Sequence, residues 1–217
     1  MRNIRKRYKK RSGIKNILIV HIENNLKEYI IASLIFIIGI LLGIVFFNSL
    51  DETQTTETNN YILSTIDLLK NNGNIDEIVI LKRSIQSNIG LVAILWLMGS
   101  TVIGLLIVYG ILCFKGFTFG YTVSAVIYGL GVGKGVIFSI MTMLLKNIVS
   151  IPCTIALSVS GMKLYKAIIQ DRRKENIKIE IIRHTLFCIF ILILLIITSF
   201  IETYTTKNIL RYCINYI

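Results

Sequence analysis

Five long apolar runs, separated by polar segments, set the pattern of this 217-residue chain. We place them at residues 29–49, at three positions within 89–161, and at 184–202. An α-helix rises about 1.5 Å per residue, so that about 20 apolar residues cross a hydrocarbon core of about 30 Å. The pattern therefore predicts an all-α, polytopic membrane protein with five transmembrane helices.

The apolar region 89–161 is divided into three predicted spans by one lysine and one glycine-rich turn. The second span is predicted from Ile89 to Phe114, and Lys115 ends it. The third, short and rich in glycine, runs from Gly116 to Val132, and the fourth from Gly135 to Gly161. Charged and glycine residues thus set the predicted boundaries.

Four polar segments flank these spans: 1–28, 50–88, 162–183 and the tail 203–217. The segment 50–88 is acidic, and its apolar residues fall on two helical stripes. The stripes predict two short amphipathic helices around 62–69 and 75–85, with Asn71-Asn72-Gly73-Asn74 as the break between them.

The direction of the chain follows from its two basic segments, 1–28 and 162–183. Basic residues collect on the cytoplasmic side of membrane proteins. Both segments are therefore predicted to be cytoplasmic, which requires an even number of spans between them, and four spans satisfy this requirement. The loop 50–88 and the C-terminus are then predicted to be extracytoplasmic.

Composition agrees with a membrane protein, since 54% of the residues are hydrophobic and the mean hydropathy is +0.70. The formal net charge of +12 lies mainly between the apolar runs, so nucleic-acid binding is not expected. The four cysteines are far apart and show no paired spacing. No disulfide framework, metal site or cofactor is predicted from them.

Catalytic patterns are missing from the sequence. The apolar runs contain no Asp or Glu when the fifth is taken from Thr185 to Ile201, just short of Glu202, and there is no HExxH, GxSxG or P-loop pattern. His21 and His184 lie at or outside the predicted span ends. The chain is therefore predicted not to be an enzyme, and an intramembrane enzyme is the least favoured class.

One charged residue is predicted to lie deep in the membrane, near the middle of the fourth run. It is Lys146, followed by Asn147 and, six residues on, by Pro152. Pro152 has no N–H, so the carbonyl of Ile148 loses its helical donor and the helix is expected to kink or break. These residues either satisfy freed backbone groups inside the bundle or form a gate, binding spot or partner contact.

Small residues recur one helical turn apart in several spans: Gly39 and Gly43, Ser100 and Gly104, Gly116 and Gly120, and Gly129 and Gly133. Such pairs let helix backbones approach closely within a membrane. Their repetition predicts a compact bundle or a homo-oligomer.

The stretch from Trp96 to Lys166 resembles the stage II sporulation protein M family of endospore-forming bacteria. The residues that carry the resemblance are Trp96, Gly99 and Gly104, then Phe114–Phe117, Gly120, Tyr121 and Val123, then Gly131 and Gly133–Gly135, and finally Asn147 and Pro152. We take Trp96, Gly99, Gly104, Lys115, Gly116, Gly120, Tyr121, Gly133, Lys146, Asn147 and Pro152 as residues of the family motif or of helix-packing or partner contacts. The basic N-terminus, the polar loop after the first span and the length also match. One departure is Leu145, where the family commonly carries a proline.

The resemblance implies a function that composition does not. It implies a non-enzymatic scaffold at the sporulation septum and the mother-cell engulfing membrane, which recruits peptidoglycan-degrading enzymes during engulfment of the forespore. The implied partners are an amidase/endopeptidase, protein P, and a lytic transglycosylase, protein D. From the residues themselves, the alternative is a membrane transport or channel component that uses Lys146, Asn147 and Pro152.

Overall fold

The computed structural model describes residue 23 and residues 25–71, 77–99, 101, 104–170 and 174–216. The helices are α2 (Leu26–Asn48), α3 (Glu52–Asn71), α4 (Glu77–Gly99), α5 (Gly104–Leu130), α6 (Val132–Ser139), α7 (Leu145–Gln170) and α8 (Lys174–Tyr216). A π-helical turn, Ile140–Leu144, joins α6 to α7. The described part of the chain contains no strand, as the all-α prediction requires.

Five of these helices are long and apolar enough to cross a membrane. Their spanning segments are Leu26–Asn48, Ile78–Gly99, Gly104–Leu130, Lys146–Ile168 and Ile177–Tyr204. The prediction of a five-span, all-α membrane protein is therefore confirmed, and the direction in which the chain crosses the membrane stays a prediction.

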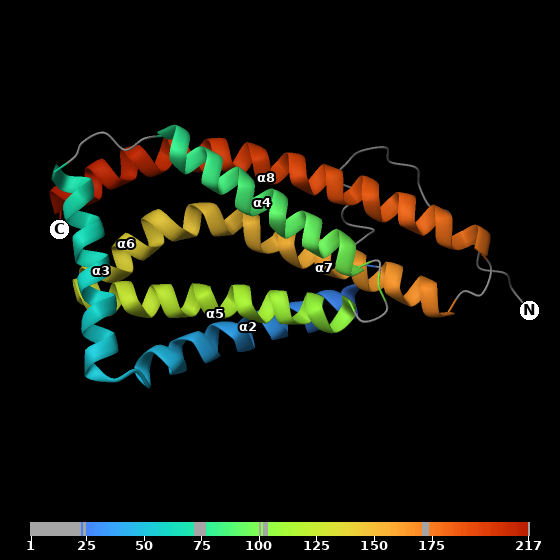
Figure 1. The fold of residues 1–217 in the computed structure, drawn as a ribbon, viewed down its shortest axis with the longest axis horizontal. Coiled ribbons are helices and arrows are strands. Elements are labelled where there is room, and N and C mark those ends of the chain that lie inside the picture. Colours follow the sequence, from blue (N-terminus) through green and yellow to red (C-terminus); the bar gives the residue numbers. More distant parts are fainter. Residues whose placement is uncertain are drawn as a thin grey trace, which may run out of the picture.

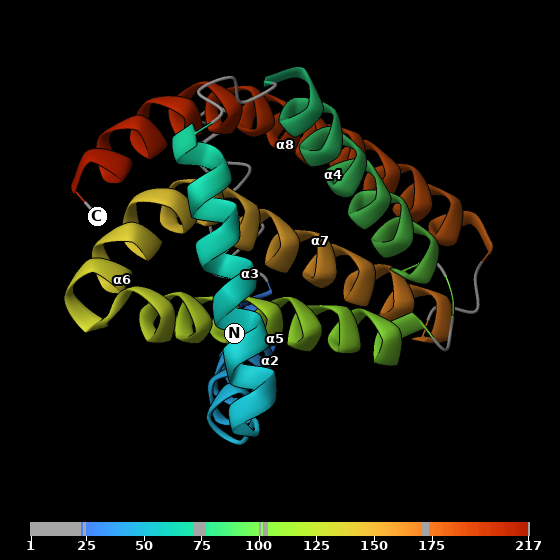
Figure 2. The ribbon, with the colours of Figure 1, turned by 60° about the vertical axis from the view of Figure 1, so that its left-hand side comes forward.

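The five spanning helices lie side by side, and α3 lies across one end of them (Figure 1; Figure 2). We call this end the α3 end. At the opposite end α7 finishes and α8 begins, and Lys163, Lys166, Lys178 and Arg183 lie near it, so we call it the basic end.

The predicted boundary between the second and third spans is wrong. α4 ends at Gly99 and α5 begins at Gly104, so Lys115 lies inside a spanning helix and does not end one. The turn between them is built from backbone bonds: Thr101 donates its amide to the Met98 carbonyl over 3.1 Å, and Gly104 donates to Thr101 over 3.2 Å. The sequence of this turn contains no proline or charged residue that would indicate it. Lys115, in contrast, resembles the end of a span because placing a lysine in lipid costs free energy.

The elements predicted for the loop 50–88 are also wrong. α3 is one helix of 20 residues, and the second expected amphipathic helix is the first part of α4, whose spanning segment begins at Ile78. Lys82 and Arg83 are exposed on this part of α4. Long cationic side chains near a helix end extend toward the interface, which makes such charges compatible with a span. Of the predicted break at residues 71–74, Asn71 is the last residue of α3, and residues 72–74 lie outside the described residues.

The other polar segments are mostly helical as well. The segment 162–183 consists of the end of α7 and the start of α8, and residues 171–173 lie outside the described part. The tail predicted at 203–217 continues α8 to Tyr216. Most of the basic segment 1–28 also lies outside the described residues.

The closest helix pair is α2 and α5, joined by a glycine interface of Gly39, Gly43, Gly116 and Gly120. A Cβ added at any of these four glycines would overlap a carbonyl oxygen of the facing helix, in turn those of Cys113, Phe117, Phe36 and Ile40. The two backbones therefore touch directly, which is the geometry that small residues one turn apart permit. The aromatic rings of Phe47, Phe117 and Tyr121 gather where this pair meets the α3 end.

The connection from α5 to α7 depends on two further glycines. Gly131, at the start of α6, has a φ of +78°, a backbone conformation that residues with a Cβ rarely adopt. Gly135 lies against the α5 backbone, since a Cβ there would come within 2.6 Å of Ile127 Cα. These positions let α6 fold back beside α5 before the π-helical turn leads into α7.

Candidate functional site

Buried and half-buried polar side chains line the space where α4, α5, α7 and α8 meet. We call this set the polar seam; its members are Ser84, Asn88, Lys115, Lys146, Ser150, Thr154, Ser158, Ser199 and Glu202. Four of them recur every fourth residue on α7, from Lys146 to Ser158, so they share one face of that helix. The seam is notable because polar groups inside a membrane must find partners within the protein.

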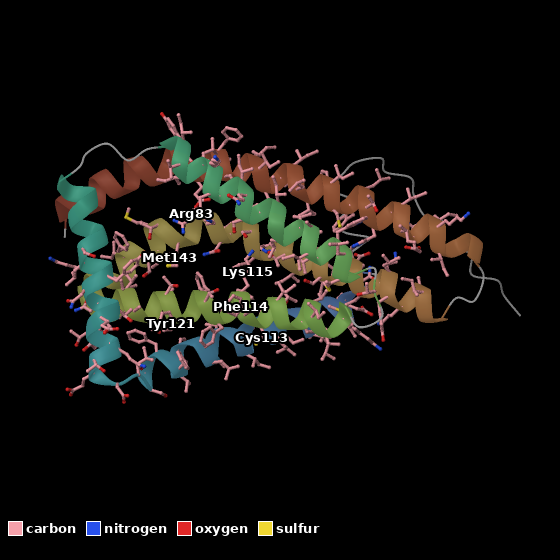
Figure 3. All side chains as sticks on the ribbon, in the orientation of Figure 1. Arg83, Cys113, Phe114, Lys115, Tyr121 and Met143 are labelled. Atoms are coloured by element: carbon pink, nitrogen blue, oxygen red, sulfur yellow. The ribbon has the colours of Figure 1, made fainter. Side chains whose placement is uncertain are left out.

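Lys115 is the most interior cation of the seam (Figure 3). Its Nζ donates to Ser150 Oγ over 2.9 Å and to Thr154 Oγ1 over 2.8 Å. Those hydroxyls are 3% and 1% exposed. The ion pairs formed within the described part of the chain do not include Lys115, so neutral hydroxyls are the partners of this cation.

One of the two hydroxyls that accept from Lys115, that of Thr154, is fixed by its own helix. Thr154 donates to the carbonyl of Ser150 over 2.7 Å, and Ser158 donates to the carbonyl of Thr154 over 2.9 Å. Thr154 thus gives its proton to the helix and keeps a lone pair for the lysine. Ser150 and Thr154 therefore present two hydroxyl acceptors to Lys115 on α5.

Lys146 lies nearer the α3 end and has a carboxylate partner. Its Nζ is 2.9 Å from Glu202 Oε1 on α8, with the lysine side chain 39% exposed and the glutamate 15% exposed. The expectation that Lys146 sits in the middle of the fourth span is wrong, because that span begins at Lys146 and not at Gly135. The separate helix α6 and the π-helical turn occupy the residues in between.

Glu202 also connects α8 to α4. Ser84 Oγ lies 2.8 Å from Glu202 Oε2 and 3.1 Å from Ser199 Oγ, and its single proton serves one of them at a time. Asn88 donates to Ser199 Oγ over 2.9 Å and approaches the Leu195 carbonyl at 3.4 Å. The α3-end part of the seam is therefore one network over three helices.

A separate polar cluster lies at the basic end around His184, which is 2% exposed. Its Nδ1 is 2.9 Å from Ser160 Oγ, and its Nε2 is 3.6 Å from Cys188 Sγ. The ring also lies beside Gly99 and Gly161, where α4 and α7 approach each other. The expectation that His184 lies at or outside the end of a span is wrong, because the fifth spanning segment, Ile177–Tyr204, includes it well inside its start.

Several motif residues help to join helices. Trp96 donates from Nε1 to Thr185 Oγ1 over 3.0 Å, linking α4 to α8. Tyr121 lies with its hydroxyl 3.3 Å from Thr58 Oγ1, which ties α3 to α5. Gly104 lies in the turn after α4, against the Met98 carbonyl.

Three motif residues take no such position. A Cβ added at Gly133 would have open space around it, so Gly133 is not a packing glycine; nearby, Gly135 packs against α5 and Gly131 is required by its positive φ. Asn147 is half-buried. Pro152 is exposed, and α7 continues through it without a break, so the irregular turn lies at Ile140–Leu144 and not at the proline.

Sequence reasoning missed Ser84, Asn88, Ser199 and Glu202. The spacing of four residues between Lys146, Ser150 and Thr154 is visible in the sequence. The partners in the seam, however, lie about 35 to 120 residues apart along the chain, on different helices. Glu202 was placed just outside the fifth run, where it gave no signal. No group of three or more His, Cys, Asp or Glu side chains is arranged for a metal ion in the described residues.

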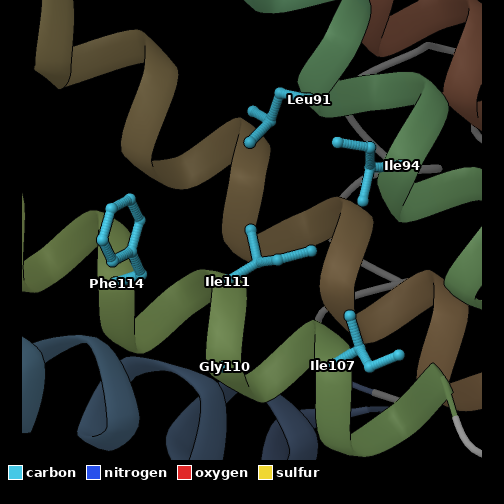
Figure 4. A pocket seen from close by; sticks show the side chains of 6 residues that line it. All are labelled: Leu91, Ile94, Ile107, Gly110, Ile111 and Phe114. Atoms are coloured by element: carbon cyan, nitrogen blue, oxygen red, sulfur yellow. The ribbon is translucent and has the colours of Figure 1, made fainter.

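An apolar groove lies beside the seam, between α4 and α5 (Figure 4). It has a volume of about 430 Å³ and is lined by Leu91, Ile94, Ile107, Gly110, Ile111 and Phe114. Its lining is aliphatic and aromatic, as expected of a surface in contact with lipid chains.

The family model described as stage II sporulation protein M matches residues 32–207, which run from α2 into α8 and include the seam, the glycine interface and His184. No match was found among curated proteins, and none among solved structures.

Proposed function

Because the chain belongs to the stage II sporulation protein M family, we propose that it is a non-enzymatic membrane scaffold that holds peptidoglycan-degrading enzymes at the sporulation septum during engulfment. The family match supports a multi-pass sporulation membrane protein. The scaffold role, the septal location and the two hydrolase partners, protein P and protein D, go beyond that match.

The observation that carries the scaffold proposal is the position of α3. This polar helix lies across the ends of the spanning helices, where the contact between Thr58 and Tyr121 ties it to α5 (Figure 1). Its outward residues include Glu57 and Tyr61, the latter 74% exposed. In the predicted orientation α3 faces the compartment in which wall hydrolases work, so it supplies a docking surface held at a fixed height above the membrane.

The hydrogen bonding of the polar seam gives weaker support. The seam side chains are occupied in joining helices, because their hydroxyls bind Lys115, Glu202, one another or their own backbone. A nucleophile needs a positioned base and a place for substrate. Within the described residues the seam offers a lysine bonded to two helix-bound hydroxyls, which suits a structural part better than a reaction centre.

The scaffold proposal is tested by affinity capture from sporulating membranes with a tagged chain. We expect proteins P and D to co-purify with the unmodified chain, and the double variant Glu57→Lys/Tyr61→Ala to lose them while keeping its own membrane level. Lys178→Gln, an exposed change at the basic end, is the matched control and should retain both hydrolases. Capture of neither hydrolase by the unmodified chain, with normal engulfment in a deletion strain, contradicts the proposal.

The polar seam favours a second candidate, a transport or channel component. Lys115 and the pair Lys146–Glu202 place charge within spanning helices, as residues that line ion pathways do. In that case Lys146→Leu would abolish activity while the hydrolases still co-purify. If assembly and activity fail together, or if neither changes, the transport candidate loses its support.

A further inference from the structure

The scaffold proposal gives no role to the His184 cluster at the basic end. This cluster borders a small cavity. The cavity lies between α7 and α8, has a volume of about 30 Å³, and is lined among others by Ser160, Lys163, Glu180, Arg183 and His184. That volume admits one water molecule or one oxygen of a larger anion. Ser160 and His184 are buried at its floor, and Arg183, with a side chain 59% exposed, stands at its mouth.

The cavity lies at the level of the membrane surface. Trp96 bonds to Thr185, one residue beyond His184, and Gly99 beside the His184 ring is the last residue of the α4 span. Tryptophan side chains collect at the boundary between hydrocarbon and headgroups. The side chains at the mouth are therefore placed at the height of phospholipid phosphates.

The charge at the mouth favours an anion. Lys163 and Arg183 supply two positive charges against the carboxylate of Glu180, which leaves one excess positive charge. Arg183 Nη1 binds Glu180 Oε1 over 2.6 Å, and a guanidinium has five N–H donors, so others remain for a phosphate. Lys163 is not among the cations paired with a carboxylate in the part of the chain that the structure describes.

We propose that this α7–α8 cavity binds the phosphate of an anionic phospholipid. Lys163 and Arg183 hold the phosphate at the mouth, and one of its oxygens enters the cavity toward the Ser160 hydroxyl. Basic pockets between membrane helices are suited to such headgroups, because the chains of the lipid remain in the bilayer while the phosphate gains charge-assisted hydrogen bonds. The proposal does not depend on the scaffold role.

The site is tested by native mass spectrometry of the purified full chain with phosphatidylglycerol, phosphatidylcholine or inorganic phosphate. We expect one tightly retained phosphatidylglycerol per chain, and no comparable retention of phosphatidylcholine. The double variant Lys163→Gln/Arg183→Gln should bind phosphatidylglycerol at least about tenfold more weakly, since it removes the charge-assisted hydrogen bonds to the phosphate from both side chains. Lys163→Arg, which keeps the positive charge, should retain most of the affinity that Lys163→Gln loses.

The control is Lys178→Gln, which removes one exposed positive charge from the same end of the molecule. It should leave lipid retention unchanged, whereas Lys163→Gln, with the same loss of charge, should weaken it. An equal effect of both single changes would mean general electrostatic attraction and overturn the site. Equal retention of inorganic phosphate at the same residues would assign the cavity to free phosphate and overturn the lipid assignment.

Discussion

The two halves of the bundle are held together by different forces. α2 and α5 touch backbone to backbone through the glycine interface, with no side chain between them at the four glycines. α4, α7 and α8 are joined to α5 and to one another by the polar seam and by a buried apolar cluster that includes Leu95, Val108, Leu157 and Leu195. The glycine contact tolerates almost no change of shape, whereas the seam depends on charge and hydrogen bonding.

The comparison explains why the residues of the two halves should respond differently to substitution. A glycine contact fails when any atom is added, because the facing carbonyl has no room to move away from a continuous helix. A polar contact fails when one partner is removed and the other is left unpaired. The following substitutions separate these two cases, beginning with the largest expected effect.

Gly120→Val should disrupt the α2–α5 pair, because the new side chain would overlap the Ile40 carbonyl. We expect a loss of about 1–3 kcal/mol or more of stability, measured as thermal unfolding of the detergent-solubilised chain. Gly110→Val, on the same helix with open space around the added atom, is the control for helix propensity. Equal destabilisation by both changes would show that the loss of stability comes from helix propensity and not from the α2–α5 contact at Gly120.

Glu202→Gln should leave Lys146 without its carboxylate and weaken the junction of α4, α7 and α8. Since the lysine is partly exposed, we expect about 1–3 kcal/mol, less than for a fully buried pair. Lys146→Met in the Glu202→Gln background should add little, and this non-additivity in a double-mutant cycle is the readout. Independent, additive losses would contradict a direct pair. Glu57→Gln, on exposed α3, should be neutral.

Lys115→Met should destabilise the protein less than Glu202→Gln does, because the loss of two hydrogen bonds to buried hydroxyls is offset by removing the cost of placing a lysine within the bilayer, about 2.5–3.5 kcal/mol. Ser150 and Thr154 lose a donor but remain on their helix, and Thr154 keeps its bond to the backbone. Lys115→Glu should be strongly destabilising. Thermal unfolding of both variants provides the measurement, and a large loss with methionine would mean that the hydrogen bonds of Lys115 outweigh its insertion cost.

Tyr121→Phe should have the smallest effect, because it removes only the contact with Thr58 while the ring keeps its place beside Phe47 and Phe117. We expect about 0.5–1 kcal/mol, seen as faster hydrogen exchange in α3 with little change in overall unfolding. Tyr128→Phe is the control, and it should leave α3 exchange unchanged. No difference between the two variants would show that α3 is held by other contacts.

The sequence was sufficient for the number and kind of spans, and for the glycines of the α2–α5 interface. Both depend on local pattern: run length in the first case, and spacing of one helical turn in the second. The element boundaries within 77–130 were not predictable in the same way, because Lys115 looks like the end of a span unless Ser150 and Thr154 are known to face it.

The same reason explains the other misplaced residues. Lys146 seemed to lie deep because the π-helical turn before α7, which shifts the start of that span, has no sequence signal of its own. Glu202 and His184 seemed to lie outside the fifth run because only tertiary contacts with Lys146 and Ser160 bring them into the bundle. Polar residues in membrane helices are placed by partners that are distant in sequence.

The most direct test of this account is the position of Lys115 relative to the membrane. Thr101→Cys and Lys115→Cys are introduced singly into a chain whose Cys113, Cys153, Cys188 and Cys213 are replaced by alanine, and both faces of the membranes are exposed to an impermeant maleimide. Labelling of Thr101→Cys, with Lys115→Cys protected until detergent is added, is the predicted result. Labelling of Lys115→Cys with protection of Thr101→Cys would show that the turn between the two spans lies at Lys115, and it would contradict the polar seam.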